Sequence, residues 1–308
     1  MLTVALVATL AAGALWRQWR GVAVEGAERA RVQSAWLLNG ALDWSRLILA
    51  GDLRESGQVD HLGEPWAVPL AEARLSTFLA AGESGTETDR EAFLSGQVTD
   101  LQSRLNVMNL LAGDGLGALE RFGRLFQTLG LPSAELGALQ RNLARAQAAM
   151  QAGGAVDGGD APLLPTRFEQ LAWLGLSPAT LAVLRPYVTL LPPLQAGQAT
   201  PVNLNTASAQ VIQAAVPGLD LAAAQHLVTQ REQAYFQDAA AALAKVKPPG
   251  AEPLDMTWAA VSTSYFEVRG RLRLDQLALE EVSVVRRAQG SVTTLWRERT
   301  ALSLPVGR

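Results

Sequence analysis

An uncharged apolar run, residues 1–16, opens the chain and passes without a break into Arg17 and a helical pattern that reaches Ile48. At about 1.5 Å per residue such a run covers roughly 24 Å, which is short of a hydrocarbon core near 30 Å. A cleaved signal peptide is one alternative, but no basic stretch precedes the run, and a buried helix is another. We expect residues 1–16 to be a retained transmembrane anchor whose first part lies upstream of Met1.

The composition of the whole chain indicates that a folded head follows this run. With 308 residues, 49% hydrophobic and 18% charged, the chain is long enough for two ordinary domains. The net charge of −3 gives no electrostatic reason to expect nucleic acid as a partner. The absence of cysteine excludes disulfides, thiol catalysis and zinc–thiolate sites.

The helical pattern after the anchor carries an apolar stripe, and we predict that this helix ends at Gly51-Asp52. A stripe left in water would cost on the order of 25 cal/mol per Å², so its exposed part is expected to contact partner helices. The stripe recurs at i, i+4, i+7 and i+11, in Leu37, Ala41, Trp44 and Ile48. A loop rich in Pro and Gly is expected to follow it.

Strand patterns lie on both sides of a long helical interval. Residues 92–100 and 265–274 alternate apolar and polar side chains, as a strand with one solvated face does. Two further strands, 282–285 and 292–296, are separated by Gln289-Gly290, which indicates an antiparallel meander. Residues 113–260 instead read as helices, among them 116–129 and 133–150, with a Gly-rich linker at 151–165.

A weak repeat at an offset of 43 residues relates Leu174–Leu184 to Pro217–Leu227. Each half predicts a helix, a Gly-Leu-(Ser/Asp) turn and a second helix. Gly175 and Gly218 would supply the left-handed conformation, and Ser177 or Asp220 would cap the next helix. A coincidence between two Ala/Leu-rich hairpins remains the alternative.

The segment Pro201–Ala207 (PVNLNTA), with the hairpin that follows, is similar to the helix-hairpin-helix modules of DNA-uptake receptors. Such modules bind phosphate through backbone N–H groups, with glycines in the turn and basic residues nearby. Asp220 stands where the second glycine would be, and residues 166–260 hold five basic against six acidic side chains. We therefore expect a structural or protein-binding hairpin and no nucleic-acid partner.

These segments together resemble the K-type minor pseudopilin (GspK family) of bacterial type II secretion systems, over nearly the whole chain and in the same order. The matching stretches are Gln33–Leu49, His61–Leu70, Ala92–Leu111, Tyr187–Pro192, Pro201–Ala207 and Val216–Glu232. The family's basic leader and processed glycine are not visible before Met1, so no processing site is assigned.

The resemblance implies an α+β, pilin-like fold: a long N-terminal helix on an antiparallel β-sheet, with a large inserted all-α domain of the helix-hairpin-helix/SAM-like type. The expected domains are the transmembrane anchor 1–16, a discontinuous pilin-like α/β domain formed by 17–112 and 261–308, and an inserted α-helical domain 113–260. The strand–helix–strand order that periodicity predicts agrees with this architecture.

The function implied by the resemblance is that of a minor pseudopilin that caps the pseudopilus tip with I- and J-type minor pseudopilins and supports export of folded proteins across the outer membrane. The expected location is the inner membrane, single-pass, with the head in the periplasm. The filament is a further expected partner, and the outer-membrane secretin and a secreted substrate are candidates. The alternatives are a membrane-anchored helix-hairpin-helix protein that binds DNA in uptake, and an anchored periplasmic enzyme.

No set of residues predicts catalysis, and no cofactor is expected with certainty. His61 and His226 are the two histidines, and they fall in different predicted domains without a catalytic motif around them. The candidate metal is Ca²⁺, which the resemblance favours and which prefers carboxylate and carbonyl oxygens. Its candidate ligands are Glu83, Glu87, Asp89 and Glu91. A solvated acidic loop without metal is the alternative.

Overall fold

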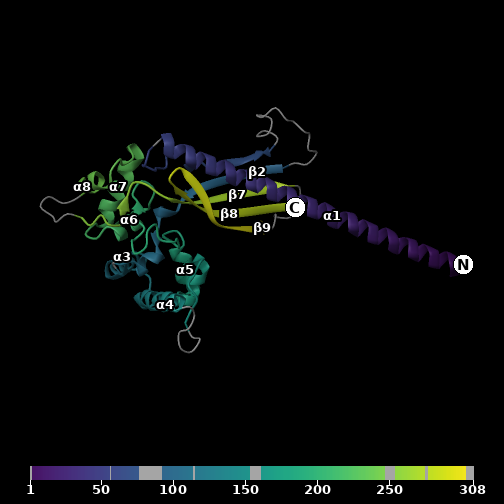
Figure 1. The fold of residues 1–308 in the computed structure, drawn as a ribbon, viewed down its shortest axis with the longest axis horizontal. Helices are drawn as coiled ribbons and strands as arrows, with labels where there is room; N and C mark the ends of the chain where they lie inside the picture. The colour runs from purple at the N-terminus through teal and green to yellow at the C-terminus, as the bar shows by residue number, and fades with distance from the viewer. Residues whose placement is uncertain are drawn as a thin grey trace.

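The protein, seen in a computed structural model, is described for residues 2–55, 57–75, 92–113, 115–152, 161–246, 254–274 and 277–302. A single helix, α1 (Leu2–Glu55), runs through the first 54 of them. Its N-terminal half projects away from the other elements, and its C-terminal half lies along a β-sheet (Figure 1). Within these ranges, no helix combines the length and the apolar character needed to cross a bilayer.

The sequence predicts that helix α1 ends at Gly51-Asp52, but in the structure the helix continues to Glu55. One glycine in a helix costs only about 1 kcal/mol relative to alanine, which tertiary contacts readily offset. Here the last turn is held by Asp52, whose carboxylate accepts a hydrogen bond of 2.8 Å from Arg287.

Within the described part of the chain, the sheet is antiparallel and has five strands in the order β1-β2-β7-β8-β9. The strands are β1 (Leu70–Arg74), β2 (Ala92–Asp100), β7 (Tyr265–Leu274), β8 (Leu277–Ala288) and β9 (Ser291–Leu302). The bounds of β2 and β7 are those predicted, β8 and β9 are longer than predicted, and β1 was not predicted. Gln289 and Gly290 join β8 to β9 with φ angles of 49° and 77°, and a two-residue turn with both angles positive matches the twist of the strands.

The two faces of the sheet differ in chemistry because side chains alternate along each strand. On β7, Phe266, Val268 and Leu272 are buried beneath α1, whereas Glu267 and Arg269 point to the opposite face. The layer between α1 and the sheet contains two apolar clusters, one around Leu42, Leu49, Trp66, Phe266 and Val285 and the other around Leu38, Leu94, Leu272 and Leu279.

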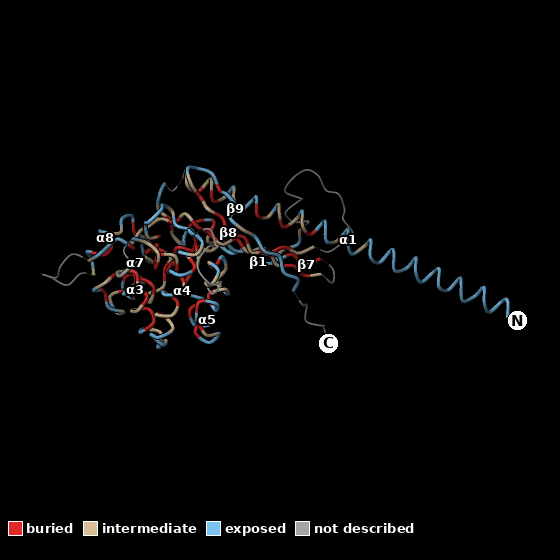
Figure 2. The backbone as a smooth tube through the Cα atoms, turned by 60° about the horizontal axis from the view of Figure 1, so that its bottom comes forward, coloured by how far each residue is buried: buried red, intermediate tan, exposed pale blue. Residues whose placement is uncertain are grey.

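The helical segment between β2 and β7 lies beyond the end of the sheet, away from the N-terminus of α1 (Figure 1). Its helices are α3 (Gly115–Thr128), α4 (Ser133–Gln151), α5 (Pro178–Leu184), α6 (Ala209–Ala215), α7 (Leu221–Gln233) and α8 (Ala239–Ala244). The 3-10 helices η2 (Leu101–Ser103), η3 (Val107–Leu111) and η4 (Phe168–Leu174) connect them to the sheet and to each other. Figure 2 shows that buried backbone is concentrated here and in the sheet, whereas the first half of α1 is exposed.

This segment has its own core, which includes Phe122, Leu125, Leu171, Ile212 and Trp258. Two pairs of two-residue parallel strands, which the sequence did not predict, also belong to it or border it. These are β3 (Leu105–Asn106) with β4 (Val188–Thr189), and β5 (Val202–Asn203) with β6 (Ala259–Ala260).

Both halves of the 43-residue repeat have the predicted turn chemistry. Gly175 and Gly218 have φ angles of 101° and 84°, in the left-handed region that favours glycine. The Ser177 hydroxyl accepts from the Thr180 N–H at 3.2 Å, and the Asp220 carboxylate accepts from the Ala223 N–H at 2.7 Å. Asp220 is therefore an N-cap, as its position in the sequence indicated.

Candidate functional site

The buried stripe of α1 lies one position along the chain from the stripe that the sequence singled out. Ser34, Leu38, Leu42 and Leu49 are buried against the sheet. Leu37, Ala41 and Ile48 flank this stripe and are half-buried, and Trp44 remains 55% exposed. The predicted residues therefore lie on the shoulder of the helix, where contact with the sheet gives way to solvent.

The opposite shoulder of α1 is polar and is hydrogen-bonded to strand β9. The Arg46 guanidinium donates to the Val292 carbonyl at 2.9 and 2.6 Å, and Arg297 donates to the Asn39 side-chain oxygen at 2.7 Å. These bonds fix the rotation of the helix about its own axis. Its apolar shoulder consequently faces the side of β1 and β2.

Beyond that shoulder, the solvent side of α1 carries further large apolar side chains. Trp36, Trp44 and Leu47 are 73%, 55% and 70% exposed. Their spacing of i, i+8 and i+11 places them on one face of the helix. Single exposed apolar residues are ordinary, but a contiguous row of them is typical of an interaction surface.

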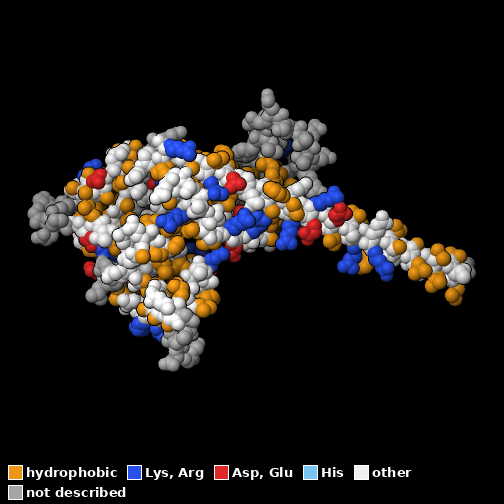
Figure 3. Space-filling view, in the orientation of Figure 1, with side chains coloured by type: hydrophobic (Ala, Val, Ile, Leu, Met, Phe, Trp, Pro, Cys, Tyr) orange, Lys and Arg blue, Asp and Glu red, His pale blue; other side chains and the backbone are white. Residues whose placement is uncertain are grey.

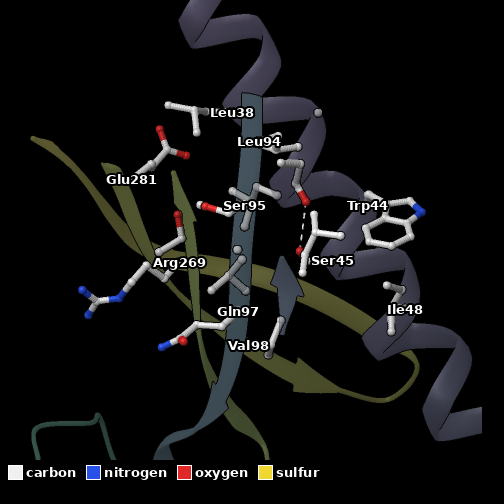
Figure 4. A pocket seen from close by; sticks show the side chains of 18 of the residues that line it. Leu38, Trp44, Ser45, Ile48, Leu94, Ser95, Gln97, Val98, Arg269 and Glu281 are labelled. Carbon is white, nitrogen blue, oxygen red and sulfur yellow. Dashed lines mark hydrogen bonds between the residues drawn. The ribbon is translucent and has the colours of Figure 1, made fainter. Parts of the chain in front are cut away.

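A groove of about 630 Å³ runs beside this row, between α1 on one side and β2 with residues 65–70 on the other. We call it the α1 groove. Leu37, Ala41, Trp44 and Ile48 all line it. Figure 4 shows Trp44, Ser45 and Ile48 projecting from α1 on one wall, with Leu94, Ser95, Gln97 and Val98 on β2. The four residues predicted as a partner interface are thus brought together along one wall.

Two paired glycines keep this part of the sheet close to the helix. Gly96 of β2 lies opposite Gly270 of β7. A Cβ on Gly270 would lie 3.4 Å from Leu38 Cδ2, and one on Gly96 would lie 2.9 Å from the Arg269 carbonyl oxygen. Side chains here would push against α1 or the neighbouring strand, so the glycines preserve both the close packing and the groove.

Polar groups also border the groove from strand β8. Glu281 is buried and accepts a hydrogen bond of 3.0 Å from Arg299 Nε on β9. The Ser283 hydroxyl, also buried, has no hydrogen-bond partner among the described residues. The wall that belongs to the sheet is therefore mixed in chemistry, with Ser95, Gln97 and Glu281 beside apolar residues.

A buried ion cluster joins the end of α1 to the sheet. Arg287 of β8 contacts Asp52 at 2.8 Å and also pairs with Asp60, and its guanidinium stacks 4.9 Å above the Phe266 ring. Asp60 in turn accepts from the Thr263 N–H at 2.7 Å. The cluster ties the end of α1 and the loop after it to the start of β7.

Glu64 completes this acidic group. Oxygen atoms of Asp52, Asp60 and Glu64 lie within 4.8 Å of one another, close enough to hold a cation. Arg287 already supplies the positive charge that two of these carboxylates need, which argues for an ion-pair cluster over a metal centre. Burial raises the pKa of Glu64 to about 7, against the opposing effect of hydrogen bonds from the His61 N–H and Trp66 Nε1.

Of the remaining candidates from the sequence, His61 lies beside the acidic cluster, with its Nε2 3.9 Å from Glu64 Oε1. Glu83, Glu87, Asp89 and Glu91, the candidate Ca²⁺ ligands, lie outside the described residues. His61 stacks on Tyr235 with 3.7 Å between ring centroids, and its Nδ1 accepts from the Gly63 N–H. His226 is exposed on α7.

The PVNLNTA motif is an internal hydrogen-bonding element. Asn203 and Asn205 are buried. The Asn203 amide donates to the Asp60 carbonyl at 3.1 Å and to the Asp100 carboxylate at 3.0 Å, and Asn205 exchanges two hydrogen bonds with the backbone of Phe236. Because both asparagine side chains form hydrogen bonds inside the protein, a structural role accounts for the PVNLNTA motif.

Comparison with known proteins identifies the family of the chain. Two family models match it, at residues 103–193 and 202–262, and both are described as type II secretion system protein K. The chain belongs to the protein K family of the type II secretion system. Its role is accordingly that of a minor pseudopilin in type II protein secretion, and the family places it in the periplasmic secretion machinery.

Relatives of known sequence or structure agree with this assignment. The type II secretion system protein K of Pseudomonas aeruginosa is 28% identical over 99% of this chain and 92% of its own length. The fold is similar to a chain in the crystal structure of the GspK-GspI-GspJ complex from the type 2 secretion system of enterotoxigenic Escherichia coli. That similarity has a TM-score of 0.63 at 17% identity and covers 89% of this chain and 98% of that one.

Sequence reasoning missed several residues of the site. Trp36 and Leu47 belong to the exposed apolar row, and Trp36 could have been found because it precedes Trp44 by eight residues, or about two turns. Residues 65–70, which form the far wall of the groove, were predicted only as a loop. Nothing in their sequence indicates that they lie beside α1.

Proposed function

We propose that this protein caps the tip of the pseudopilus in a complex with I- and J-type minor pseudopilins, and so supports export of folded proteins across the outer membrane. The observation that carries the proposal is the α1 groove with the adjoining row of Trp36, Trp44 and Leu47. A partner helix laid along this side of α1 would bury large apolar side chains that are otherwise in water.

The structural neighbour supports this choice of partners. Its crystal structure contains GspK together with GspI and GspJ. Pilin-like partners bring N-terminal helices, and a helix is the element that fits beside an exposed apolar row with helical spacing. The polar shoulder of α1 is already bonded to β9, so its apolar shoulder is the side on which a second helix would pack.

The position of the helical segment supports the tip assignment. It lies beyond the sheet at the end opposite the N-terminus of α1 (Figure 1). In a filament built by stacking such helices, a subunit arriving above this one would meet the helical segment. A subunit of this shape is therefore suited to the end of a filament and poorly suited to its middle.

The N-terminal part of α1 supports attachment to the inner membrane, with the head in the periplasm. Hydrophobic side chains gather at this end of the helix (Figure 3). Leu2, Val4, Leu6, Val7 and Leu10 are all well exposed, and no charged residue precedes Arg17. Such a segment needs an apolar environment, which a bilayer or a bundle of pilin helices provides.

The test is complex formation by the full chain, purified in detergent micelles, with I- and J-type pseudopilins from the same secretion system. Size-exclusion chromatography should show one stoichiometric complex. Trp44→Glu should weaken it strongly, whereas Trp173→Glu should not. Trp173 makes a matched control because it is also 55% exposed but lies on η4, away from the groove. Elution of the wild-type chain alone, under conditions where the other two associate, would refute the proposal.

A further inference from the structure

A second cavity, of about 570 Å³, lies on the face of the sheet opposite α1, where the helical segment approaches the strands. β7, β8 and β9 contribute one wall, and η4 with the end of α5 and strand β4 contributes the other. Arg104, which directly follows η2, also lines the cavity. Its charged lining residues are Arg104, Arg167, Glu169, Arg185, Glu267, Arg269 and Glu298, and we call it the arginine cleft.

Every carboxylate in the cleft already has an arginine partner. Arg167 pairs with Glu298 at 3.0 Å. Arg185 pairs with Glu169 at 2.9 Å, and Arg269 pairs with Glu267 at 2.9 Å. Among the lining residues, four arginines against three glutamates leave one positive charge in excess, and Arg269 also contacts Glu280, outside the lining, at 3.2 Å.

The excess charge is that of Arg104. Among the described residues, its guanidinium forms neither a hydrogen bond nor an ion pair, although the side chain is only partly exposed. Burial lowers the pKa of Arg104, the nearby carboxylates of Glu267 and Asp100 oppose that shift, and the more weakly acting charges of Arg269 and Arg185 add to it. Glu267 and Asp100 stabilise this partly desolvated cation from a distance without a direct ion pair, so its guanidinium keeps free donors for an additional anion.

The cleft also has an apolar wall beside these charges. Val188 and Val284 are buried within it, and Trp296 is half-buried. The Arg167 guanidinium lies 3.8 Å from the centroid of the Trp296 ring, so it covers one face of the indole. A ligand that filled this space would therefore need apolar as well as anionic groups.

We propose that the arginine cleft binds an acidic polypeptide segment, with one Asp or Glu carboxylate on Arg104 and a neighbouring apolar side chain against Trp296. A carboxylate carries the single negative charge that matches the excess, and its two oxygens fit the fork of a guanidinium. A phosphate, with nearly two charges, would exceed that balance in the presence of three glutamates, and it would leave the apolar wall unused.

This surface is separate from the α1 groove, because it lies on the other face of the sheet. It could therefore be occupied while pilin-like partners cover α1. The inference does not depend on the proposed tip complex, since the two residues that carry it, Arg104 and Trp296, do not line the α1 groove.

The probe is a fluorescein-labelled peptide in which glutamate and leucine alternate, and the measurement is fluorescence anisotropy with the full chain in detergent micelles. Arg104→Ala should weaken binding roughly tenfold or more, as expected for loss of a charge-assisted hydrogen-bonded pair. Arg104→Lys should restore part of the affinity, because it keeps the charge and loses the fork. Arg141→Ala, which removes an exposed arginine from α4, is the matched control and should bind as the wild type does.

Two further arms separate the possible ligands. The same peptide with glutamine in place of glutamate should not bind, and inorganic phosphate should not compete at concentrations that leave the ionic strength nearly unchanged. Equal affinity of the wild type and Arg104→Ala, or equal binding of the glutamine peptide, would overturn the proposal. Displacement by phosphate that depends on Arg104 would also overturn it, because it would make the cleft a general anion site.

Discussion

Arg287 of β8 donates a 2.8 Å hydrogen bond to Asp52 in the last turn of α1, and both side chains are buried. Asp52→Ala removes one of the two carboxylates that this guanidinium contacts and leaves Arg287 paired with Asp60 alone, and losing a buried hydrogen bond to a charged group costs about 1.5–3 kcal/mol. We predict that Asp52→Ala lowers the thermal unfolding midpoint markedly. Glu25→Ala, which breaks the exposed Arg29–Glu25 pair, should change it little, since exposed pairs contribute about 0–1 kcal/mol. Similar midpoints for the two variants would contradict the role given to the cluster.

The pairing of β2 with β7 should be sensitive to a side chain at Gly96. An added Cβ would lie 2.9 Å from the Arg269 carbonyl oxygen, which belongs to rigid strand backbone. We expect Gly96→Ala to destabilise the protein by about 1–3 kcal/mol in chemical denaturation. Gly26→Ala on α1 has nothing within 4 Å of the new Cβ and should be neutral or slightly stabilising. A Gly96→Ala protein as stable as Gly26→Ala would show that this strand pair can relax.

The stability of the protein should depend on pH through Glu64. Its pKa is raised by burial from 4.5 to about 7, so between these values the folded state retains a proton that the unfolded state has lost. The contribution of Glu64 to stability is therefore fully present below about pH 4.5 and is lost as the pH rises through 7. We predict that the thermal midpoint falls more between pH 5 and 8 in the wild type than in Glu64→Gln.

The comparison with Glu64→Gln isolates this group from its neighbours. Burial also raises the pKa of Asp100 to about 6, which acts in the same direction, and burial lowers the pKa of His61, which acts in the opposite one. Both remain in the variant. Parallel midpoint curves for the two proteins would show that Glu64 does not bind its proton in this range.

The asparagines of the PVNLNTA motif should matter for stability. Asn203→Ala would leave the Asp60 carbonyl and the Asp100 carboxylate without a donor they now have, and a buried group left without its partner costs about 1–3 kcal/mol. We expect a larger loss in chemical denaturation than for Asp220→Ala, which removes an exposed helix cap worth about 1 kcal/mol. A larger loss of stability for Asp220→Ala than for Asn203→Ala would indicate that water replaces the Asn203 amide.

The same motif should not confer DNA binding. Its asparagines are buried, and the turn that follows presents the Asp220 carboxylate where phosphate would approach. Fluorescence anisotropy with a duplex oligonucleotide should detect no binding at physiological salt. Micromolar affinity that falls steeply with added salt would contradict this prediction, because that slope reports release of counterions by basic side chains.

Much of the sheet could be predicted from sequence because one of its faces is polar. In β7, Glu267, Arg269 and Arg271 alternate with apolar residues, and such a pattern marks both the strand and its orientation. Strand β1 has no such pattern. Its sequence, Leu-Ala-Glu-Ala-Arg, contains residues that favour helices, and pairing with β2 makes it a strand.

The candidate interface could be predicted only approximately. Apolar side chains cover both the buried face of α1 and the shoulder beside it, so periodicity alone could not separate Leu38 and Leu42 from Leu37 and Ala41. The cluster of Asp52, Asp60 and Arg287 could not be predicted at all, because Arg287 is distant in sequence from the two carboxylates and none of the three belongs to a recognisable motif.

The pairing of β2 with β7, in which Asp100 lies opposite Phe266, sets an order for folding. The ribosome makes β2 first and must complete the whole helical segment before β7 emerges, a delay on the order of ten seconds or more at about 5–20 residues per second. During this time β2 has no partner on that edge. Because the helical segment has a core of its own, its early folding would bring the two ends of the interruption together and shorten the loop that must close. The segment that separates the strands along the chain would then also be what brings them together.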